Sequence, residues 1–252
     1  MSVCRTFPRS TDPTVASVRR PGEAGHVELY DVMRTTFACR DWTDDPVDDA
    51  TIHRVLDNAR FAPNGGNRQG QRIIVQRDRS VRQQLIPMIR PTTDIYMAQT
   101  AAGEAPWQSV HPTTVDEAAI RANDGPVTFP GTANMIDVPV WLIVLLDMSV
   151  AASFDKYLDR VGVISGASIY PLAWNILMAA RNEGLGGVLT TYFADPEPQV
   201  QALLGIPDHF AVAAVLPIGH PVKQLTKLRR KSVEEFAVRE RFDGEPFIID
   251  EG

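Results

Sequence analysis

Three separated segments of the chain combine residue types that suit a flat, negatively charged ligand. In the first segment Arg40 precedes a Pro-Val step that leads into a helical pattern. In the second, Asn67 and Gln69 lie on a loop whose glycines let the backbone approach a flat ligand closely. The third segment, in an otherwise acidic chain, contains the cations Lys227, Arg229, Arg230 and Lys231. Each segment also has a purely structural explanation: a surface arginine, a helix-ending turn and a solvated basic patch.

Several common catalytic motifs are absent from the sequence. The five histidines have no His-x-x-x-His spacing, and Cys4 and Cys39 form no Cys-x-x-Cys pair, so we expect no metal site. The Gly-x-Ser-x-Gly elbow of serine hydrolases and the Gly-x-x-x-x-Gly-Lys phosphate loop are missing. Glycines within residues 184–187 follow a helical pattern, which is typical of a helix C-cap and not of a dinucleotide fingerprint. Cys39 beside Arg40 is interpreted as a small structural cysteine.

Composition favours one globular domain without nucleic-acid or membrane partners. The 252 residues are 44% hydrophobic and 22% charged, and the formal net charge of -6 is opposite to that of a typical nucleic-acid binder. Two cysteines suit a reducing cytosol, so we expect a cytoplasmic protein. Residues 1–25 are expected to form a flexible arm. The uncharged run at residues 161–180 is diluted by Gly, Ser, Pro and Asn, which favours a buried helix over a membrane span.

Alternating helical and strand patterns run along the rest of the chain. Helices are expected over residues 27–33, 51–60, 80–89, 198–204 and in a long segment ending at 182, and strands over 72–77, 138–147, 188–193 and 210–218. The apolar run at 138–147 is typical of a strand covered on both faces. Residues 90–137 are rich in Pro, Thr, Gly and Ala and are expected to be irregular, as in a functional or interface segment. This order indicates an α/β or α+β sandwich.

A series of motifs between residues 29 and 236 resembles one known family. The motifs are Arg-x-x-x-x-x-Arg-x-Trp-x-x-x-Pro-Val, Ala-Arg-Phe-Ala-Pro-x-Gly-Gly-Asn-x-Gln, a helix ending in Ala-Ala-Arg-Asn-Glu-Gly-Leu-Gly, Leu-Leu-Gly-Ile-Pro, Pro-Ile-Gly-His-Pro and Arg-Arg-Lys-Ser-Val-Glu-Glu. In this order they resemble the FMN-dependent nitroreductases, which are NAD(P)H-dependent flavin oxidoreductases. The resemblance implies an α+β sandwich with a mainly antiparallel central sheet, built as an intertwined homodimer with FMN at the interface. Residues 26–252 would form one domain, with residues 90–137 as the variable insertion that shapes the substrate pocket.

The resemblance also implies how the chain would hold the FMN phosphate. The phosphate is a dianion, and arginine or lysine groups that converge on it donate charge-assisted hydrogen bonds. Arg40 and the tail cations at residues 229–231 are the expected donors. The departures from the family lie beside Arg40, since the family commonly has Arg-Arg-Ser-x-Arg where this chain has Thr36, Phe37, Ala38, Cys39 and Arg40. The loss of two cations and a hydroxyl would weaken FMN binding, shift the phosphate onto Arg34 and the tail, or mark altered cofactor use.

The resemblance places other residues along the flavin ring. Asn67 carries one donor group and one acceptor, which match the pyrimidine edge of the flavin, and in the family this asparagine contacts the flavin or its ribityl chain. Gln69 serves the same ligand or ties the loop to the backbone. Leu189, Thr190 and Thr191 would lie beside the reactive edge, where a backbone N–H orients hydride transfer at N5. Gln71 stands where the family usually has Trp or Phe.

The resemblance implies an FMN-dependent oxidoreductase, and the departures leave two alternatives. The enzyme would take hydride from NADH or NADPH onto flavin N5 and pass electrons to an acceptor such as a nitroaromatic or a quinone, with no side chain as catalytic acid or base. One alternative is a flavin-binding or flavin-storage protein with little turnover. The other is a dimeric scaffold that has lost FMN.

Overall fold

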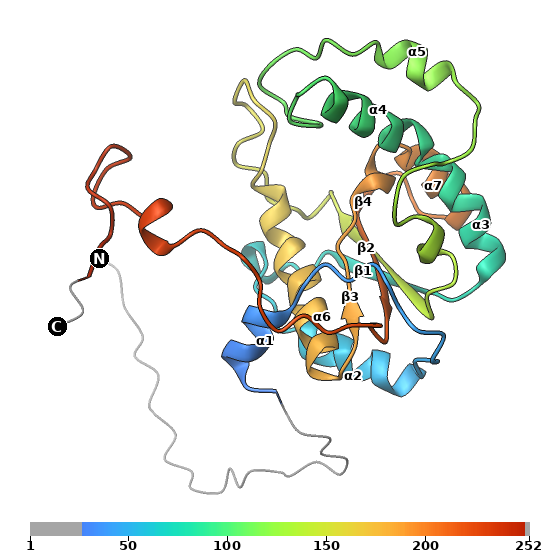
Figure 1. Cartoon of the computed structure of the whole chain (residues 1–252), viewed down its shortest axis with the longest axis horizontal. Coiled ribbons are helices and arrows are strands. Elements are labelled where there is room, and N and C mark those ends of the chain that lie inside the picture. The colour runs from blue at the N-terminus through green and yellow to red at the C-terminus, as the bar shows by residue number, and fades with distance from the viewer. Residues whose placement is uncertain (1–26, 250–252) are drawn as a thin grey trace, which may run out of the picture.

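The computed structural model describes residues 27–249, and an antiparallel sheet lies at its centre (Figure 1). The strands are β1 (Gln71–Gln76), β2 (Val140–Asp147), β3 (Gly186–Gly187) and β4 (Phe210–Gly219). Their order is β1-β2-β4-β3, and every neighbouring pair is antiparallel. The predicted α+β sandwich with a mainly antiparallel central sheet is therefore confirmed.

Helices cover both faces of this sheet (Figure 1). They are α1 (Leu29–Thr35), α2 (Asp49–Ala59), α3 (Arg79–Met88), α4 (Arg90–Ala101), α5 (Glu117–Ala122), α6 (Tyr170–Asn182) and α7 (Glu197–Leu204). Buried residues of α2 and α6 form one hydrophobic core, and buried residues of α3 and α7 belong to a second core. The sheet separates the two cores and contributes to both.

Strand β2 is covered on both faces, which explains the uninterrupted apolar run in its sequence. Val140, Leu142 and Val144 lie in the core with α2 and α6, whereas Trp141 and Ile143 lie in the core with α3 and α7. Successive side chains of a strand point to opposite faces, so both sets must be apolar when both faces are covered. All five residues are buried.

Aspartates set the beginnings of two of the predicted helices. The Asp48 carboxylate accepts a hydrogen bond from the Thr51 N–H at 2.6 Å, and α2 begins at the next residue, Asp49. The Asp78 carboxylate accepts from the Ser80 N–H at 2.8 Å ahead of α3. Each cap satisfies an N–H that has no partner within the helix. The helices begin within two residues of the predicted positions.

The prediction that residues 90–137 are irregular is wrong in part, because the segment contains α4 and α5. Pro91 stands in the first turn of α4, where its missing N–H breaks no helical hydrogen bond. The buried face of α4 includes Thr93 and Gln99 beside Ile95. A buried face with so many polar residues hides the helix from a search for hydrophobic periodicity.

The predicted long helix ending at residue 182 is shorter than expected at its N-terminal end. Helix α6 begins at Tyr170, and Val161 and Val163 lie in a loop with exposed fractions of 63% and 64%. The Asp155 carboxylate accepts hydrogen bonds from the Val163 N–H at 2.7 Å and from Arg160 at 2.9 Å. These bonds hold the loop in a non-helical conformation. The uncharged run at residues 161–180 therefore contains exposed loop residues as well as buried residues of α6.

The predicted strand over residues 188–193 is wrong. Strand β3 ends at Gly187, Thr190 forms a single antiparallel bridge with Val215, and a short 3-10 helix, η4 (Tyr192–Ala194), follows. A Cβ atom on Gly187 would lie 2.8 Å from Leu177 Cδ2 and 3.0 Å from the Pro217 carbonyl oxygen. Only a glycine allows this close passage over α6 and β4, and the chain then turns out of the sheet.

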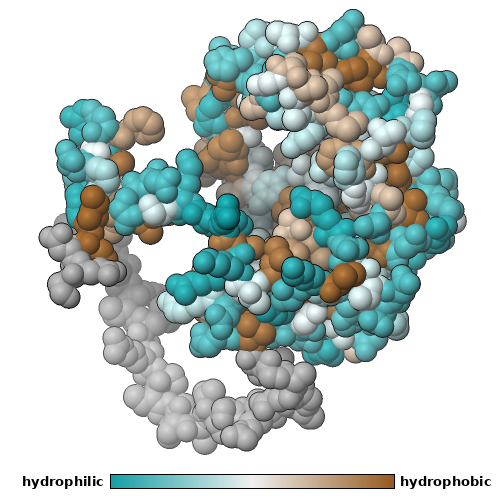
Figure 2. Space-filling model, in the orientation of Figure 1, coloured by the Kyte–Doolittle hydropathy of each residue, from teal (hydrophilic) through white to brown (hydrophobic). Residues whose placement is uncertain are grey.

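Residues 222–249 form a C-terminal tail that extends away from the folded body (Figure 1). Near its start, the Gln224 side-chain amide donates to the Thr35 carbonyl oxygen at 3.0 Å and holds the tail against the end of α1. Apolar side chains farther along the tail are exposed, and they form hydrophobic patches on it in Figure 2. The tail therefore buries little of its own apolar surface within this chain.

The predicted arm at residues 1–25 lies outside the described residues, so the division into an arm and a single domain over 26–252 stays a prediction.

Within residues 27–249, none of the helices has the length and apolar composition required to cross a bilayer.

Candidate functional site

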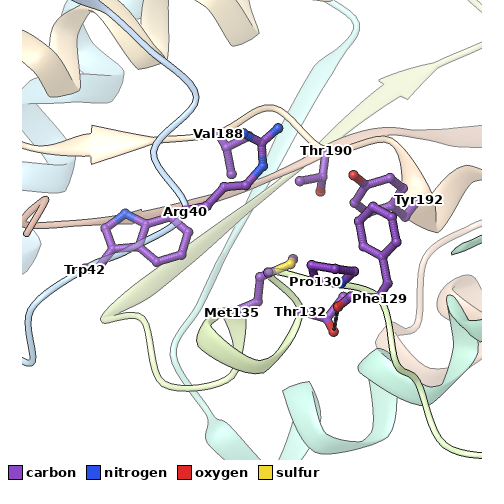
Figure 3. A pocket seen from close by; sticks show the side chains of 10 residues that line it. Arg40, Trp42, Phe129, Pro130, Thr132, Met135, Val188, Thr190 and Tyr192 are labelled. Atoms are coloured by element: carbon purple, nitrogen blue, oxygen red, sulfur yellow. Dashed lines mark hydrogen bonds between the residues drawn. The ribbon is translucent and has the colours of Figure 1, made fainter. Parts of the chain in front are cut away.

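A cleft of about 260 Å³, open to solvent, lies where the chain leaves β3 (Figure 3). Three segments far apart in the sequence meet there: residues 40–42, residues 129–135 of the insertion and residues 188–192. The lining residues are Arg40, Trp42, Phe129, Pro130, Gly131, Thr132, Met135, Val188, Thr190 and Tyr192. We call this the aromatic cleft. It is concave, mainly apolar and carries a single charge, as small-molecule sites commonly do.

Backbone contacts to β3 place the first of these segments. Ala38 forms a parallel bridge with Gly187, and the Cys39 N–H donates to the Gly187 carbonyl oxygen at 3.0 Å. The Trp42 indole N–H donates to the Gly186 carbonyl oxygen at 2.9 Å. Residues 38–42 thus run beside residues 186–190, so that Arg40 and Thr190 line the same cleft.

Aromatic rings from the insertion and from η4 form one wall of the aromatic cleft. The ring centroids of Phe129 and Tyr192 are 5.3 Å apart, and those of Phe129 and Tyr96 are 5.7 Å apart, both in edge-to-face geometry. Burial raises the pKa of the Tyr192 hydroxyl, so this residue is neutral at physiological pH. A neutral aromatic wall favours contact with another flat ring.

Arg40 is the only charged residue among those described that line the aromatic cleft. Its side chain donates one hydrogen bond, from Nη1 to the Ala38 carbonyl oxygen at 3.4 Å, and it forms no ion pair with a carboxylate within residues 27–249. Figure 3 shows its guanidinium group beside Val188 at the edge of the cleft. The donors of this guanidinium are therefore available to a ligand that carries negative charge or carbonyl acceptors.

A second cleft of about 160 Å³ is lined in part by neighbouring residues of the same two segments. Its lining residues are Thr36, Phe37, Leu177, Arg181, Leu185, Gly186, Gly187 and Gln224. We call it the Arg181 cleft. The two clefts share no lining residue. Met135 of the aromatic cleft belongs to the core of α3 and α7, whereas Leu185 of the Arg181 cleft belongs to the core of α2 and α6. The two clefts therefore lie on different sides of residues 186–188.

The residues predicted to lie near the flavin ring differ in their surroundings. The N–H and the hydroxyl of Thr190 both donate to the Val215 carbonyl oxygen, at 3.0 and 2.9 Å. Leu189 packs partly buried against the core of α2 and α6, and Thr191 is exposed. Both hydrogen-bond donors of Thr190 are therefore used within the protein. Thr191 is the exposed residue of the three.

The other predicted ligand-binding residues lie apart from the aromatic cleft within this chain. Asn67 and Gln69 have left-handed φ values of 52° and 51°, and their exposed loop is attached to Ser168 by a hydrogen bond from the Gly65 N–H. Among the described residues, no hydrogen bond or ion pair joins this loop to Arg40. Arg229, Arg230 and Lys231 are exposed on the tail.

Cys39 has the structural role that the sequence indicated. Its side chain is 1% exposed, and its thiol donates to the Asp41 carbonyl oxygen at 3.3 Å. Burial raises the pKa of this thiol, which keeps it protonated and unreactive at neutral pH. A Cβ atom on Gly186 would lie 3.0 Å from the Cys39 sulfur, so a larger side chain than cysteine does not fit beside β3.

Sequence reasoning missed most of the residues that line the two clefts. Phe129 and Tyr192 come from segments whose polar or irregular composition concealed the aromatic wall. Arg181 was part of a helix motif and received no role of its own, although it lines a cleft with Phe37. Trp42 lay in a quoted motif, and an aromatic residue two positions after Arg40 was the one available signal.

Comparison with known proteins identifies the family. The Nitroreductase family model matches residues 33–220. The chain belongs to the nitroreductase family. A curated relative, the NADH dehydrogenase of Thermus thermophilus, is 28% identical over 185 residues, which cover 73% of this chain and 82% of that protein.

Solved structures share the nitroreductase fold with this chain. Oxidized iodotyrosine deiodinase bound to FMN and 3-iodo-L-tyrosine has a TM-score of 0.58 at 19% identity, over 85% of this chain and 99% of that one. The NADPH:FMN oxidoreductase from Vibrio harveyi, complexed with NAD+, has a TM-score of 0.56 at 18% identity, over 80% and 72% of the two chains. At these identities the likeness shows the fold alone.

The two clefts of this nitroreductase-family chain fit the chemistry of FMN. The aromatic cleft offers a neutral ring wall and a cation for a flat ring system that carries carbonyl acceptors, and the Arg181 cleft contains a second cation. Neither cleft includes a carboxylate that would repel a phosphate. Within residues 27–249, no cluster of His, Cys, Asp and Glu is arranged to hold a metal ion.

Asp195 ties the insertion to the segment that carries the aromatic wall. Its carboxylate accepts two hydrogen bonds from Arg121 of α5, both at 3.0 Å, and one from the Thr92 hydroxyl of α4 at 2.8 Å. Burial acts to raise the pKa of Asp195, but the bonds from Arg121 and Thr92 outweigh it and hold that pKa below its usual value. The ionised carboxylate therefore anchors α4 and α5 beside η4.

We expect Asp195→Asn to release α5 from the body without unfolding the protein. Losing the charge of a bidentate partner should speed amide hydrogen exchange in residues 117–122 by about 10-fold. Because the folded pKa of Asp195 is lowered, this anchorage is complete above the ordinary carboxyl pKa of about 3.9 and is lost as pH falls further. Below about pH 4 the protection factors of these amides in the wild type should therefore fall toward those of the variant. Equal exchange rates in both proteins at pH 7 would contradict the anchoring role.

Proposed function

We propose that this chain is an FMN-dependent oxidoreductase that accepts hydride from NADH or NADPH and passes electrons to a nitroaromatic, a quinone or a similar acceptor. The observation that carries the proposal is the pairing of Arg40 with an aromatic wall in one cleft. Membership of the nitroreductase family and the names of the relatives support it. The choice of FMN as cofactor rests on the same grounds.

The residues of the chain would bind and orient the reactants. Bound FMN supplies the hydride and electron transfer chemistry. Arg40 donates to the electron-rich edge of the ring, and the wall formed by Phe129 and Tyr192 holds flat rings while excluding water. The aromatic cleft has no His, Cys, Asp, Glu or Lys among its described lining residues, and the Tyr192 hydroxyl is the one lining group of a type that commonly transfers protons.

We also propose that the site is completed in a homodimer. The exposed apolar residues of the tail include Val233, Phe236, Phe242, Phe247 and Ile249, and Phe242 is fully exposed. Their burial against a second copy would contribute roughly 25 cal/mol per Å² of apolar surface. A second copy would also let Asn67, Gln69 and the tail cations reach a flavin from which they are distant within one chain. Patches of this kind on a surface mark an interaction site.

The visible absorption spectrum of the purified protein tests this proposal. After incubation with FMN and gel filtration, we expect a protein-bound flavin spectrum that bleaches under anaerobic conditions when NADH or NADPH is added. The same sample should sediment at twice the 27.8 kDa mass of one chain. A quinone or nitroaromatic should restore the oxidised spectrum, and alternate addition of the two substrates should show ping-pong kinetics.

Two outcomes of the same experiment would favour the alternatives. A bound flavin that neither NADH nor NADPH reduces would favour a flavin-binding or storage protein. A colourless protein after incubation with FMN would favour a scaffold that has lost the cofactor, and would overturn the proposed function.

A further inference from the structure

We infer that the Tyr192 hydroxyl donates the proton that a quinone takes up when it is reduced in the aromatic cleft. This inference rests on the proposed function, because it assigns a role within the same oxidoreductase reaction. It adds a catalytic residue to that reaction, for which the sequence indicated no side-chain acid or base. Three features support it: the hydrogen bonds of the other donors in the cleft, the position of the Tyr192 hydroxyl and the charge of Arg40.

The side-chain donors of the aromatic cleft differ in whether their protons are already used. Backbone carbonyl oxygens accept the side-chain hydrogen bonds of Trp42, Thr132 and Thr190. The guanidinium of Arg40 keeps its protons in proteins. The other described lining residues, apart from Tyr192, have no polar side-chain group. Among the described lining residues, only Tyr192 therefore has a proton that it can give to a ligand.

The Tyr192 hydroxyl is accessible from the cleft. Within residues 27–249 it forms no hydrogen bond, whereas every fully buried polar side-chain atom in that range has a partner. The hydroxyl oxygen therefore lies on the accessible surface. Figure 3 shows it directed toward Thr190, on the side of the cleft where the guanidinium of Arg40 also lies. A ligand in the cleft can thus accept a hydrogen bond from Tyr192.

The position of the Tyr192 ring is fixed by its neighbours in the fold. Its centroid lies 5.3 Å from that of Phe129, in edge-to-face geometry. Thr190, two residues earlier, exchanges backbone hydrogen bonds with Val215 at 3.0 and 2.9 Å, and Phe193, the next residue, is buried. The hydroxyl is held in place before a ligand binds, which lowers the entropic cost of a proton transfer.

The electrostatic surroundings of Tyr192 suit a proton donor. Burial raises the pKa of its hydroxyl above the usual value of about 10, so the group is protonated at neutral pH. Arg40 acts in the opposite direction on this pKa, because its positive charge stabilises the phenolate that remains after the proton leaves. Tyr192 therefore keeps its proton until a strongly basic oxygen forms beside it.

The reduction of a quinone forms such an oxygen. NADH or NADPH supplies a hydride by way of bound FMN, and a quinone that accepts it at one carbonyl oxygen becomes a hydroquinone monoanion. The other oxygen of this product is a phenolate. The O–H bond of Tyr192 breaks, its proton forms the second O–H bond of the hydroquinone, and Tyr192 becomes the phenolate.

Donor and product in this step are both phenols, so the proton moves between groups of similar basicity. Water then returns a proton to Tyr192, because the cleft is open to solvent. The complete reaction consumes one hydride and one proton for each quinone.

Tyr192→Phe tests this role because it removes the hydroxyl and keeps the ring of the aromatic wall. Stopped-flow absorbance of protein-bound FMN should be recorded separately for reduction by NADH or NADPH and for reoxidation. Two acceptors should be compared: a benzoquinone, which takes up protons, and ferricyanide, which takes up electrons alone. The control is Tyr30→Phe, which also removes one hydroxyl. Tyr30 lies on α1 and lines neither cleft.

In Tyr192→Phe we expect the dissociation constant of FMN and the rate of bleaching by NADH or NADPH to match the wild type, since neither depends on a side-chain acid. Reoxidation by the benzoquinone should be slower by about 100-fold, as for the loss of a positioned general acid. Reoxidation by ferricyanide should be unchanged. Wild-type reoxidation by the benzoquinone should also be slower in D2O than in H2O. Tyr30→Phe should match the wild type throughout.

Three results would count against the inference, and one of them separates it from the proposed function. An equal loss of rate with the benzoquinone and with ferricyanide would show that Tyr192 positions the reactants and donates no proton. An unchanged rate with the benzoquinone would assign the proton to water and leave the proposed function intact. A wild type that binds no FMN, or whose FMN neither NADH nor NADPH bleaches, would overturn both.

Discussion

Replacing Arg82 with leucine should lower the free energy of unfolding by about 3–5 kcal/mol. Arg82 is 2% exposed and lies against the Trp141 ring, 5.4 Å from its centroid. Its guanidinium donates to the side-chain and backbone oxygens of Gln76 and to the carbonyl oxygens of Ile136, Val138 and Pro139. Leucine would leave these buried acceptors without donors, at a cost that is large for each group.

Loss of Arg82 should also disturb the aromatic cleft. The Arg82 hydrogen bonds join Gln76 of β1 to Ile136 at the end of the insertion, next to Met135, which lines that cleft. Burial lowers the pKa of Arg82 to about 10, so the folded state carries a desolvation cost that only the full set of acceptors offsets. Arg82→Lys retains the charge but cannot reach five oxygens, and it should also be destabilised. Urea-induced unfolding followed by tryptophan fluorescence would measure these differences.

Arg79→Leu is the matched control for Arg82. Arg79 lies three residues earlier on α3, with a side chain that is 58% exposed and an ion pair to Asp137 at 2.8 Å. Its loss should change the free energy of unfolding by less than about 1 kcal/mol, as for other exposed ion pairs. If the two leucine variants were equally stable, the hydrogen bonds of Arg82 would contribute nothing net and its role in the fold would be refuted.

Replacing Arg40 with alanine should weaken binding of FMN and riboflavin alike, by about 10- to 100-fold. The reason is that Arg40 lines the aromatic cleft with Thr190 and Tyr192, so its donors serve the ring that both ligands share. Titration of flavin fluorescence with each ligand would measure both affinities.

Asn67→Ala should also weaken both flavins, provided that a second copy brings this loop to the ring. A matched control is Arg77→Gln, which removes an arginine paired with Asp49 at 2.8 Å and far from either lining set. This control should bind both flavins as the wild type does. Unchanged flavin binding in both Arg40→Ala and Asn67→Ala would refute the assignment of these residues to the cofactor.

Elements with strong local signals could be predicted from the sequence. Apolar residues at helical spacing after Asp48 predicted α2, and the uninterrupted apolar run predicted β2, because burial on two faces leaves no room for polar positions. Gly184, with its φ of 77°, directly follows the C-cap residue Glu183 and ends α6 as the glycine cluster indicated. The order of the motifs was also enough to recognise the family, which the match over residues 33–220 confirms.

The helices of the insertion could not be predicted in the same way. Helix α4 has a proline in its first turn and buries threonine and glutamine side chains. Its stability comes from contacts such as the anchor at Asp195, about one hundred residues away in the sequence. The end of β3 at Gly187 depends on the close approach of Leu177 and Pro217. The formation of α4 and the end of β3 both depend on packing between distant segments, and a local sequence pattern cannot predict such packing.

For the candidate site, the sequence determined the chemical groups and the tertiary structure decided which of them act together. Arg40, Asn67 and the tail cations were visible from their types and motifs. Only the pairing of residues 38–42 with β3 brought Arg40 to Thr190, and only the packing of α6 against α1 brought Arg181 beside Phe37. A binding site needs charges and rings within a few ångströms of each other, and that proximity arises from long-range contacts between segments that are distant along the chain.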